Sequence, residues 1–263
     1  MFRKRLMSQT MLAVMLSMAL VGQPLLSQRA FAAGGDFSLD FVASAPFTYD
    51  HATGGGAFDD RTVGKNRDVV ESLEGGDFAC GDWVTHLVQI KVDSGASGVQ
   101  NIRLRFAFSA HSTGQQGAAY GDLDHVQVNY GAVSGGDGPG GIDSGIVDLD
   151  GNPGSSTATL IDESIDDPPG IFNKQAELRG TVDITDLEAG EEIILRIDAR
   201  IFCDGQTPTG NLQGTITSAN VLNGTTVGDV INVGTQTIPL KRVGDIKICP
   251  PKGCEEPPPP DPK

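Results

Sequence analysis

The chain has 263 residues, of which 35 are glycine and 15 are proline, and its 34 acidic residues outnumber the 19 basic ones. Glycine is nearly twice as frequent as in ordinary globular proteins, but glycine and proline together stay below the level that is typical of chains without a core. Because an acidic chain repels phosphates and anionic lipid, this composition argues against nucleic acid and membrane surfaces as partners.

The first 32 residues have the three-part layout of a secretory signal. A basic cluster at residues 3–5 precedes an apolar run at 11–21, and residues 30–32 are Ala-Phe-Ala, the small-x-small pattern before a cleavage site. An apolar run of this length is too short to span a bilayer, and the sequence predicts no other membrane span. Since the signal carries four of the 19 basic residues, the mature chain would keep 15 against 34 acids, a formal charge of −19.

Alternation of apolar and polar residues with a period of two, the signature of half-buried strands, dominates the chain from residue 34 onward. Glycine-rich turns separate the runs, and only residues 66–74, with Asn66 as a cap, are interpreted as a helix. Strands are predicted at 37–43, 82–92, 101–109, 124–130, 157–161, 178–184, 192–202, 211–221, 230–240 and 243–248.

Many short strands with almost no helix predict an all-β protein, an Ig-like or jelly-roll β-sandwich. We expect one domain at 33–248, followed by a Pro-rich tail or spacer at 249–263. The stretches 81–92 and 190–201 resemble each other, which suggests a duplicated strand pair. We favour the simpler explanation that sandwich hairpins look alike.

Residues 183–221 read DITDLEAGEEIILRIDARIF, then TGNLQGTITSANV after a short insertion. This stretch resembles the Ig-like conserved-repeat domains of exported bacterial surface proteins, in which a Leu-x-x-Gly-Glu turn enters a long strand and an Asn-x-x-x-hydrophobic strand follows. The resemblance implies a sandwich of seven or more strands in an envelope or secreted protein, and it implies no chemistry. The matching positions are Leu187, Gly190, Glu191, Asn211, Ile216 and Val221.

Four cysteines remain after removal of the signal, and an oxidising compartment favours disulfides over free thiols. Cys80 precedes the strand at 82–92 and Cys203 follows the strand at 192–202. If those strands are antiparallel neighbours, the two cysteines meet and staple the domain. For Cys249 and Cys254 we favour a short disulfide loop, although C-x4-C can also begin a zinc site.

His86 falls on the inward face of its strand, where a histidine is more often a hydrogen-bonded core residue than a ligand. His111, Asp122, Asp124 and His125 are residue types that could bind a transition metal. Their glycine-rich surroundings give no fixed spacing, however, so we favour an ordinary loop composition.

The best cation candidate is a partial calcium loop at residues 143–152. Asp148, Asp150 and Asn152, with Asp143 nearby, follow the alternating oxygen ligands with which such a loop begins. The pattern then fails, because Pro153 stands where the turn glycine belongs. No cofactor is expected beyond this possible calcium ion.

No hydrolase, P-loop or dinucleotide-binding motif is present, and the scattered acids around Glu163 do not define a glycosidase pair. The sequence therefore predicts a non-enzymatic secreted or cell-envelope module for structure or adhesion, with an extracellular protein or glycan as its partner. The alternative is a carbohydrate-binding module with structural calcium, in which Trp83, facing away from Val84, would stack on a sugar.

Overall fold

The computed structural model describes residues 34–44, 69–111, 117–129, 156–165, 171–172, 176–233 and 236–248. By its internal contacts the chain divides into two units, Met1–Ala30 and Phe31–Lys263, and all described residues belong to the second. The predicted signal at 1–32, the partial calcium loop at 143–152 and the Pro-rich tail at 249–263 lie outside the described residues.

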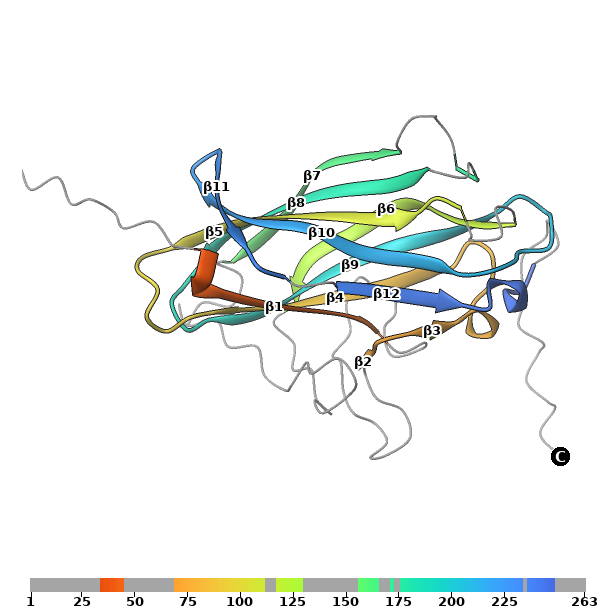
Figure 1. The fold of residues 1–263 in the computed structure, drawn as a ribbon, viewed down its shortest axis with the longest axis horizontal. Helices are drawn as coiled ribbons and strands as arrows, with labels where there is room; N and C mark the ends of the chain where they lie inside the picture. The colour runs from red at the N-terminus through yellow and green to blue at the C-terminus, as the bar shows by residue number, and fades with distance from the viewer. Residues whose placement is uncertain are drawn as a thin grey trace, which may run out of the picture. The chain divides into compact units, whose positions relative to one another are not determined.

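The described part consists of β-strands and three short 3-10 turns, as the period of two predicts (Figure 1). The strands are β1 (Phe37–Ser44), β2 (Val69–Val70), β3 (Leu73–Glu74), β4 (Trp83–Val92), β5 (Gln100–Ser109), β6 (Ala118–Asn129), β7 (Thr157–Ile165), β8 (Glu177–Leu187), β9 (Glu192–Cys203), β10 (Leu212–Asn223), β11 (Thr226–Ile231) and β12 (Gln236–Lys241). The turns are η1 (Gly34–Asp36), η2 (Gly75–Asp77) and η3 (Val243–Asp245).

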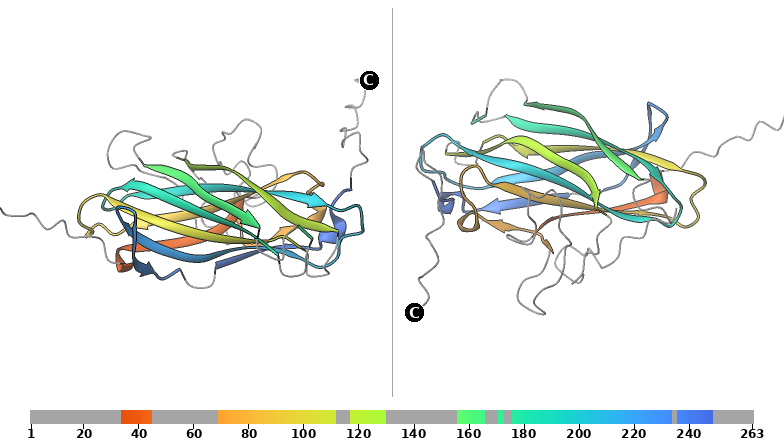
Figure 2. Two further views of the ribbon diagram at one scale, coloured as in Figure 1. Left: turned by 90° about the horizontal axis from the view of Figure 1, so that it is seen from above. Right: turned by 180° about the vertical axis from the view of Figure 1, so that it is seen from behind.

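These strands form two sheets that pack as a sandwich, so the predicted fold class is confirmed (Figure 2). One sheet has the strand order β2-β1-β4-β9-β6. The other has the order β3-β12-β10-β5-β8-β7, and β11 pairs with β10 beside β12. Nearly all of the described pairings are antiparallel; the short β3–β12 pair is parallel.

The inward faces of both sheets form one buried apolar cluster. From the first sheet it takes Val84, Val88 and Ile90 of β4, and from the second it takes alternate residues of β5, including Ile102 and Phe106. Strands buried on one face need this alternation, because successive side chains of a strand point to opposite faces.

Three sequence predictions about local structure are wrong. The predicted helix at 66–74 is strand at Val69–Val70 and Leu73–Glu74 in its described part. The predicted strand at 230–240 is two strands, β11 and β12. The predicted strand at 243–248 begins as the 3-10 turn η3. Short apolar runs do not reveal whether they pair in a sheet, because pairing partners lie far away in the sequence.

Candidate functional site

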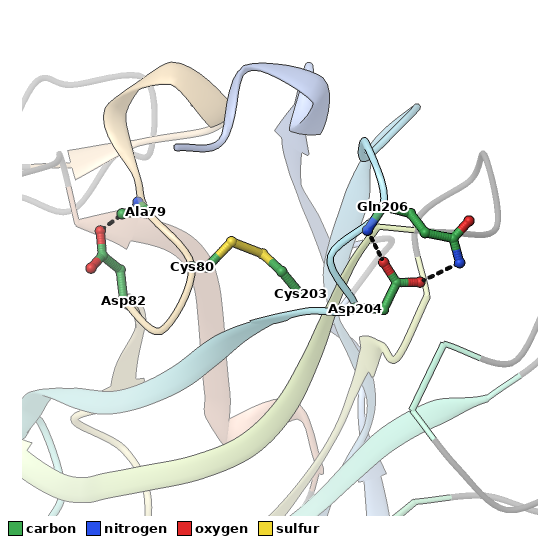
Figure 3. Close-up of a disulfide and its surroundings, with 6 residues drawn as sticks. All are labelled: Ala79, Cys80, Asp82, Cys203, Asp204 and Gln206. Carbon is green, nitrogen blue, oxygen red and sulfur yellow. Dashed lines mark hydrogen bonds between the residues drawn. A yellow bond between two sulfur atoms is a disulfide. The ribbon is translucent and has the colours of Figure 1, made fainter. Parts of the chain in front are cut away.

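The end of the sandwich near η3 carries the predicted disulfide (Figure 3). Cys80 and Cys203 are bonded, with their Cα atoms 5.7 Å apart and a sequence separation of 123. The strands β4 and β9 are antiparallel neighbours, as the prediction required. Backbone hydrogen bonds continue the pairing to the disulfide, with Gly81 N donating to Ile201 O over 2.8 Å. The other two cysteines, Cys249 and Cys254, lie outside the described residues.

An arginine near this disulfide makes cation–π contacts with two aromatic rings. Trp83 of β4 lies opposite Arg200 of β9, and the guanidinium carbon of Arg200 is 5.6 Å from the centre of the Trp83 ring. The same carbon is 5.4 Å from the centre of the Phe202 ring. The guanidinium Nε donates a hydrogen bond of 3.1 Å to the carbonyl of Gly81. All three side chains are half-buried, so this aromatic–arginine cluster forms part of the surface.

The aromatic–arginine cluster depends on a glycine in the neighbouring strand. A Cβ atom at Gly121 of β6 would lie 2.8 Å from the Phe202 ring and 2.4 Å from Ile171. Real Cβ atoms essentially never approach other heavy atoms so closely. The missing side chain at Gly121 therefore leaves the space in which Phe202 lies beside Arg200.

Two exposed aspartates flank the disulfide (Figure 3). Asp82 accepts a hydrogen bond from Ala79 N over 2.6 Å. Asp204 accepts one from Gln206 N over 2.8 Å and one from Gln206 Nε2 over 3.2 Å. Each carboxylate therefore has acceptor capacity left, since its two oxygens together offer about four lone-pair positions.

His86 lies in the interior, as its inward position predicts. Its side chain is fully buried among aromatic rings, with centroids 5.7 Å from Phe41, 4.9 Å from Phe108 and 6.0 Å from Tyr120. Nδ1 donates to the carbonyl of Val84 over 3.2 Å. Burial lowers the pKa of His86 to about 4, against the opposing effects of the Val84 hydrogen bond and the charge of Asp198. The histidine is therefore a neutral core residue at neutral pH.

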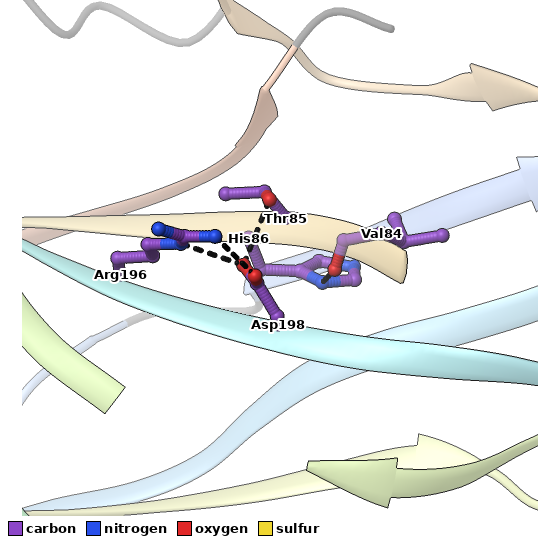
Figure 4. Close-up of polar contacts among 5 residues, drawn as sticks. All are labelled: Val84, Thr85, His86, Arg196 and Asp198. Carbon is purple, nitrogen blue, oxygen red and sulfur yellow. Dashed lines mark hydrogen bonds and ion pairs between the residues drawn. The ribbon is translucent and has the colours of Figure 1, made fainter. Parts of the chain in front are cut away.

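A second buried polar group lies on the opposite face of β4 and β9 (Figure 4). Arg196 and Asp198 are both fully buried and form a bidentate pair, in which Nε donates to Oδ1 over 2.9 Å and Nη2 donates to Oδ2. Thr85 donates a further hydrogen bond of 2.7 Å to Asp198 Oδ1. The pair satisfies its charges internally, which is how buried charges are tolerated.

Three acids meet where β6 passes β7. Glu163 of β7 accepts a hydrogen bond of 3.1 Å from Leu123 N, at a bulge of β6. Burial raises the pKa of Glu163, and the negative charges of Asp122 and Asp124 raise it further. The sequence did not predict this neighbourhood, because β6 and β7 belong to different sheets.

The other predicted metal ligands give no metal centre in the part of the chain that the structure describes. There, no group of three or more His, Cys, Asp or Glu side chains could hold a metal ion. His111 Nδ1 donates to the carbonyl of Ala176 over 3.2 Å, and the His125 side chain is outside the described residues. The calcium candidates Asp143, Asp148, Asp150 and Asn152 are also outside them. Within the described ranges, no helix is long and apolar enough to cross a membrane.

Comparisons with known proteins leave the family open. No family model matches the chain, and no curated protein matches it. Among solved structures, a cohesin module of a family 33 glycoside hydrolase from Clostridium perfringens ATCC13124 aligns with a TM-score of 0.31 and 9% identity, over 65% of this chain and 89% of that one. A family 123 glycoside hydrolase from Clostridium perfringens aligns with a TM-score of 0.27 and 9% identity, over 78% of this chain and 27% of that one. At these scores neither likeness supports an argument about function.

Proposed function

We propose that the protein is exported and serves outside the cytoplasm as a non-catalytic module for structure or adhesion. The observation that carries this proposal is the Cys80–Cys203 disulfide, which joins two core strands across 123 residues. Structural disulfides form and persist mainly in oxidising compartments. The predicted signal sequence at 1–32 and the resemblance of residues 183–221 to exported surface domains support the same location.

The position of the reactive side chains supports a role without turnover. General acid–base catalysis needs a titratable group within hydrogen-bond reach of a substrate. His86, Tyr120, Arg196 and Asp198 all have no solvent-exposed surface. Their contacts are to the surrounding core and to one another, so they serve the packing of the sandwich.

Export can be tested by cell fractionation. We expect the full-length chain, expressed in a bacterium, to appear outside the cytoplasm and to be labelled on intact cells by an amine reagent that cannot cross membranes. A matched chain that lacks residues 2–32 should stay in the cytoplasm and escape the label. Equal cytoplasmic retention of both chains would contradict the proposal.

A second candidate function is binding of an extracellular ligand, and the aromatic–arginine cluster of Trp83, Arg200 and Phe202 favours it. Aromatic rings and arginine are enriched where proteins bind partners, and these three are half-buried on one face. The Trp83 ring is partly covered by Arg200, so simple stacking of a sugar on Trp83 is a weaker form of this proposal than recognition by the whole cluster. Calcium binding by Asp148 and Asp150 remains a separate prediction, which calorimetric titration of the chelator-treated protein would test.

A further inference from the structure

We propose that the aromatic–arginine cluster of Trp83, Arg200 and Phe202 is a docking surface for a proline-rich, acidic segment, and that this segment is the chain's own tail, residues 249–263. The inference rests on the second candidate function, in which the cluster binds a ligand, and it names the chemistry that the cluster recognises. All three side chains are partly exposed, and both rings contact the same guanidinium.

Arg200 has no carboxylate partner among the residues that the structure describes. The described arginines that do form ion pairs are Arg103, Arg179, Arg196 and Arg242. Arg200 instead gives one hydrogen bond of 3.1 Å, from Nε to the carbonyl of Gly81. Within the described ranges, its terminal groups Nη1 and Nη2 have no acceptor. A planar guanidinium with free N–H groups is suited to bind a carboxylate.

The tail begins beside this cluster. Close to the end of the described residues, the carbonyl of Lys247 accepts a hydrogen bond of 3.0 Å from Cys80 N. The next residue, Gly81, provides the carbonyl that holds Arg200. Two residues of extended chain span at most about 7 Å. The eight residues from Lys247 to Glu255 reach about 25 Å as a polyproline helix, so the acidic part of the tail can reach the cluster.

The composition of the tail matches both parts of the cluster. Seven of its 15 residues are proline, and residues 255–260 read Glu-Glu-Pro-Pro-Pro-Pro. Proline-rich segments bind aromatic surfaces as preformed polyproline helices, which lose little entropy on binding. The centres of the Trp83 and Phe202 rings both lie within 5.6 Å of one carbon, so they are at most about 11 Å apart. Four prolines span about 9 Å, which is enough to contact both rings while a glutamate meets Arg200.

Tethering favours the chain's own tail over a separate ligand. The whole chain has a formal charge of −15, so a free acidic ligand would approach against repulsion. The tail has three acidic and two basic residues, a net charge of only −1, and it is attached next to the cluster. A short flexible tether gives an effective concentration in the millimolar range. A contact too weak to hold a free ligand is therefore strong enough to keep the tail docked.

The test compares the mature chain, residues 33–263, with the same chain ended at Ile248, both with the Cys80–Cys203 disulfide formed. Trp83 is the only tryptophan in the chain, so its fluorescence reports on the cluster. We expect its emission maximum to shift when the tail is removed. The capped peptide EEPPPPDPK, residues 255–263, should reverse this shift and saturate below about 10 mM, near the effective concentration of the tail. The same peptide should change the emission of the full chain less, because the tail already occupies the surface.

Matched peptides and variants locate the contact. A peptide with Glu255→Gln and Glu256→Gln should bind the shortened chain about 10- to 100-fold more weakly, the range for loss of hydrogen bonds to a charged group. Arg200→Ala should weaken binding of the original peptide by a similar factor and leave binding of the glutamine peptide unchanged, because both changes remove the same interaction. The control Arg179→Ala alters an exposed arginine of β8, on the other sheet, and should leave both affinities unchanged.

Urea unfolding curves show whether each variant is folded, and the comparison of the two peptides needs no altered protein. The same Trp83 emission with and without the tail would overturn the inference, as would equal binding of the glutamate and glutamine peptides. A tail-dependent shift that appears only as the protein concentration rises would assign the surface to the tail of a second copy and would also overturn it. None of these results bears on export, which the fractionation experiment tests separately.

Discussion

Strand β9 carries two arginines on the same face, four residues apart, and they differ in every respect that matters for function. Arg196 is completely buried and gives two hydrogen bonds to Asp198, which is also buried. Arg200 is half-buried, makes cation–π contacts with Trp83 and Phe202, and gives one hydrogen bond to a backbone carbonyl. Both project from the side of the sheet that faces away from the core cluster.

This difference shows that one strand can carry both a buried arginine that belongs to the scaffold and a half-buried arginine at the surface. A buried charge has to be paired within the protein, and such a pair has no exposed surface that a ligand could reach. An arginine held by cation–π contacts keeps its terminal N–H groups available. The sandwich therefore has a sealed centre, which contains the buried residues His86, Arg196 and Asp198, and a disulfide end, which contains the Cys80–Cys203 bond, Trp83 and Arg200.

The largest effect is expected at the disulfide end, from the Cys80→Ser, Cys203→Ser double variant. Freeing a loop of 123 residues should lower the free energy of unfolding by about 5 kcal/mol, because the unfolded chain regains its closure entropy. Urea unfolding of the variant and of the parent protein measures this difference. A loss below about 1 kcal/mol would mean that hydrogen bonding of β4 to β9 holds this end without the covalent bond.

Within the sealed centre, Asp198→Asn should lower the free energy of unfolding by about 3–5 kcal/mol, because it leaves the buried charge of Arg196 without its counter-ion. The matched control is the Arg196→Met, Asp198→Leu double variant, which removes both charges and should cost less. Urea unfolding of both proteins checks the order. The opposite order would contradict the assignment of this pair to the sealed centre.

The pH dependence of stability tests His86. Its pKa is about 4 when folded and about 6.5 when unfolded, so the unfolded state binds the proton more readily and stability falls as the pH drops from 6.5 towards 4. Between pH 7.5 and pH 5 this contribution amounts to about 2 kcal/mol. Urea unfolding at both pH values measures it. A His86→Leu variant should lack that part of the slope; an unchanged slope in it would show that other groups cause the pH dependence.

The smallest change in stability is expected from Arg200→Ala, and it separates the disulfide end from the sealed centre most clearly. Arg200→Ala should lower the free energy of unfolding by only about 1 kcal/mol, since cation–π contacts at partly exposed sites are weak. Thermal unfolding of this variant beside Asp198→Asn measures the contrast between the two regions. A loss from Arg200→Ala as large as that from Asp198→Asn would place Arg200 in the scaffold.

Much of the scaffold could be predicted from the sequence because its determinants are local. Alternation in 82–92 and 192–202 identifies two strands, and the cysteines at their ends identify them as antiparallel neighbours. The disulfide even fixes the register: counting inward from Cys80 and Cys203 by equal steps brings Trp83 opposite Arg200, the pair that the structure has. The contact of Arg200 with Trp83 therefore follows from that register, which the position of Trp83 alone does not reveal.

The rest depends on contacts that the local pattern does not contain. Alternation with a period of two predicts strands buried on one face, yet Thr85, Leu87 and Gln89 of β4 are buried on the side that faces away from the core cluster. The neighbourhood of Glu163 and Asp122 depends on how the edges of two sheets meet. No spacing along the sequence encodes either feature, because both arise from packing between distant segments.

The most direct test of the exported, disulfide-stapled module is peptide mapping of the protein recovered from outside the cytoplasm, by mass spectrometry without reduction. We expect a new N-terminus after Ala32 and a linked pair of peptides that contain Cys80 and Cys203. Free thiols at these two positions, or a bond from Cys80 to Cys249 or Cys254, would contradict it.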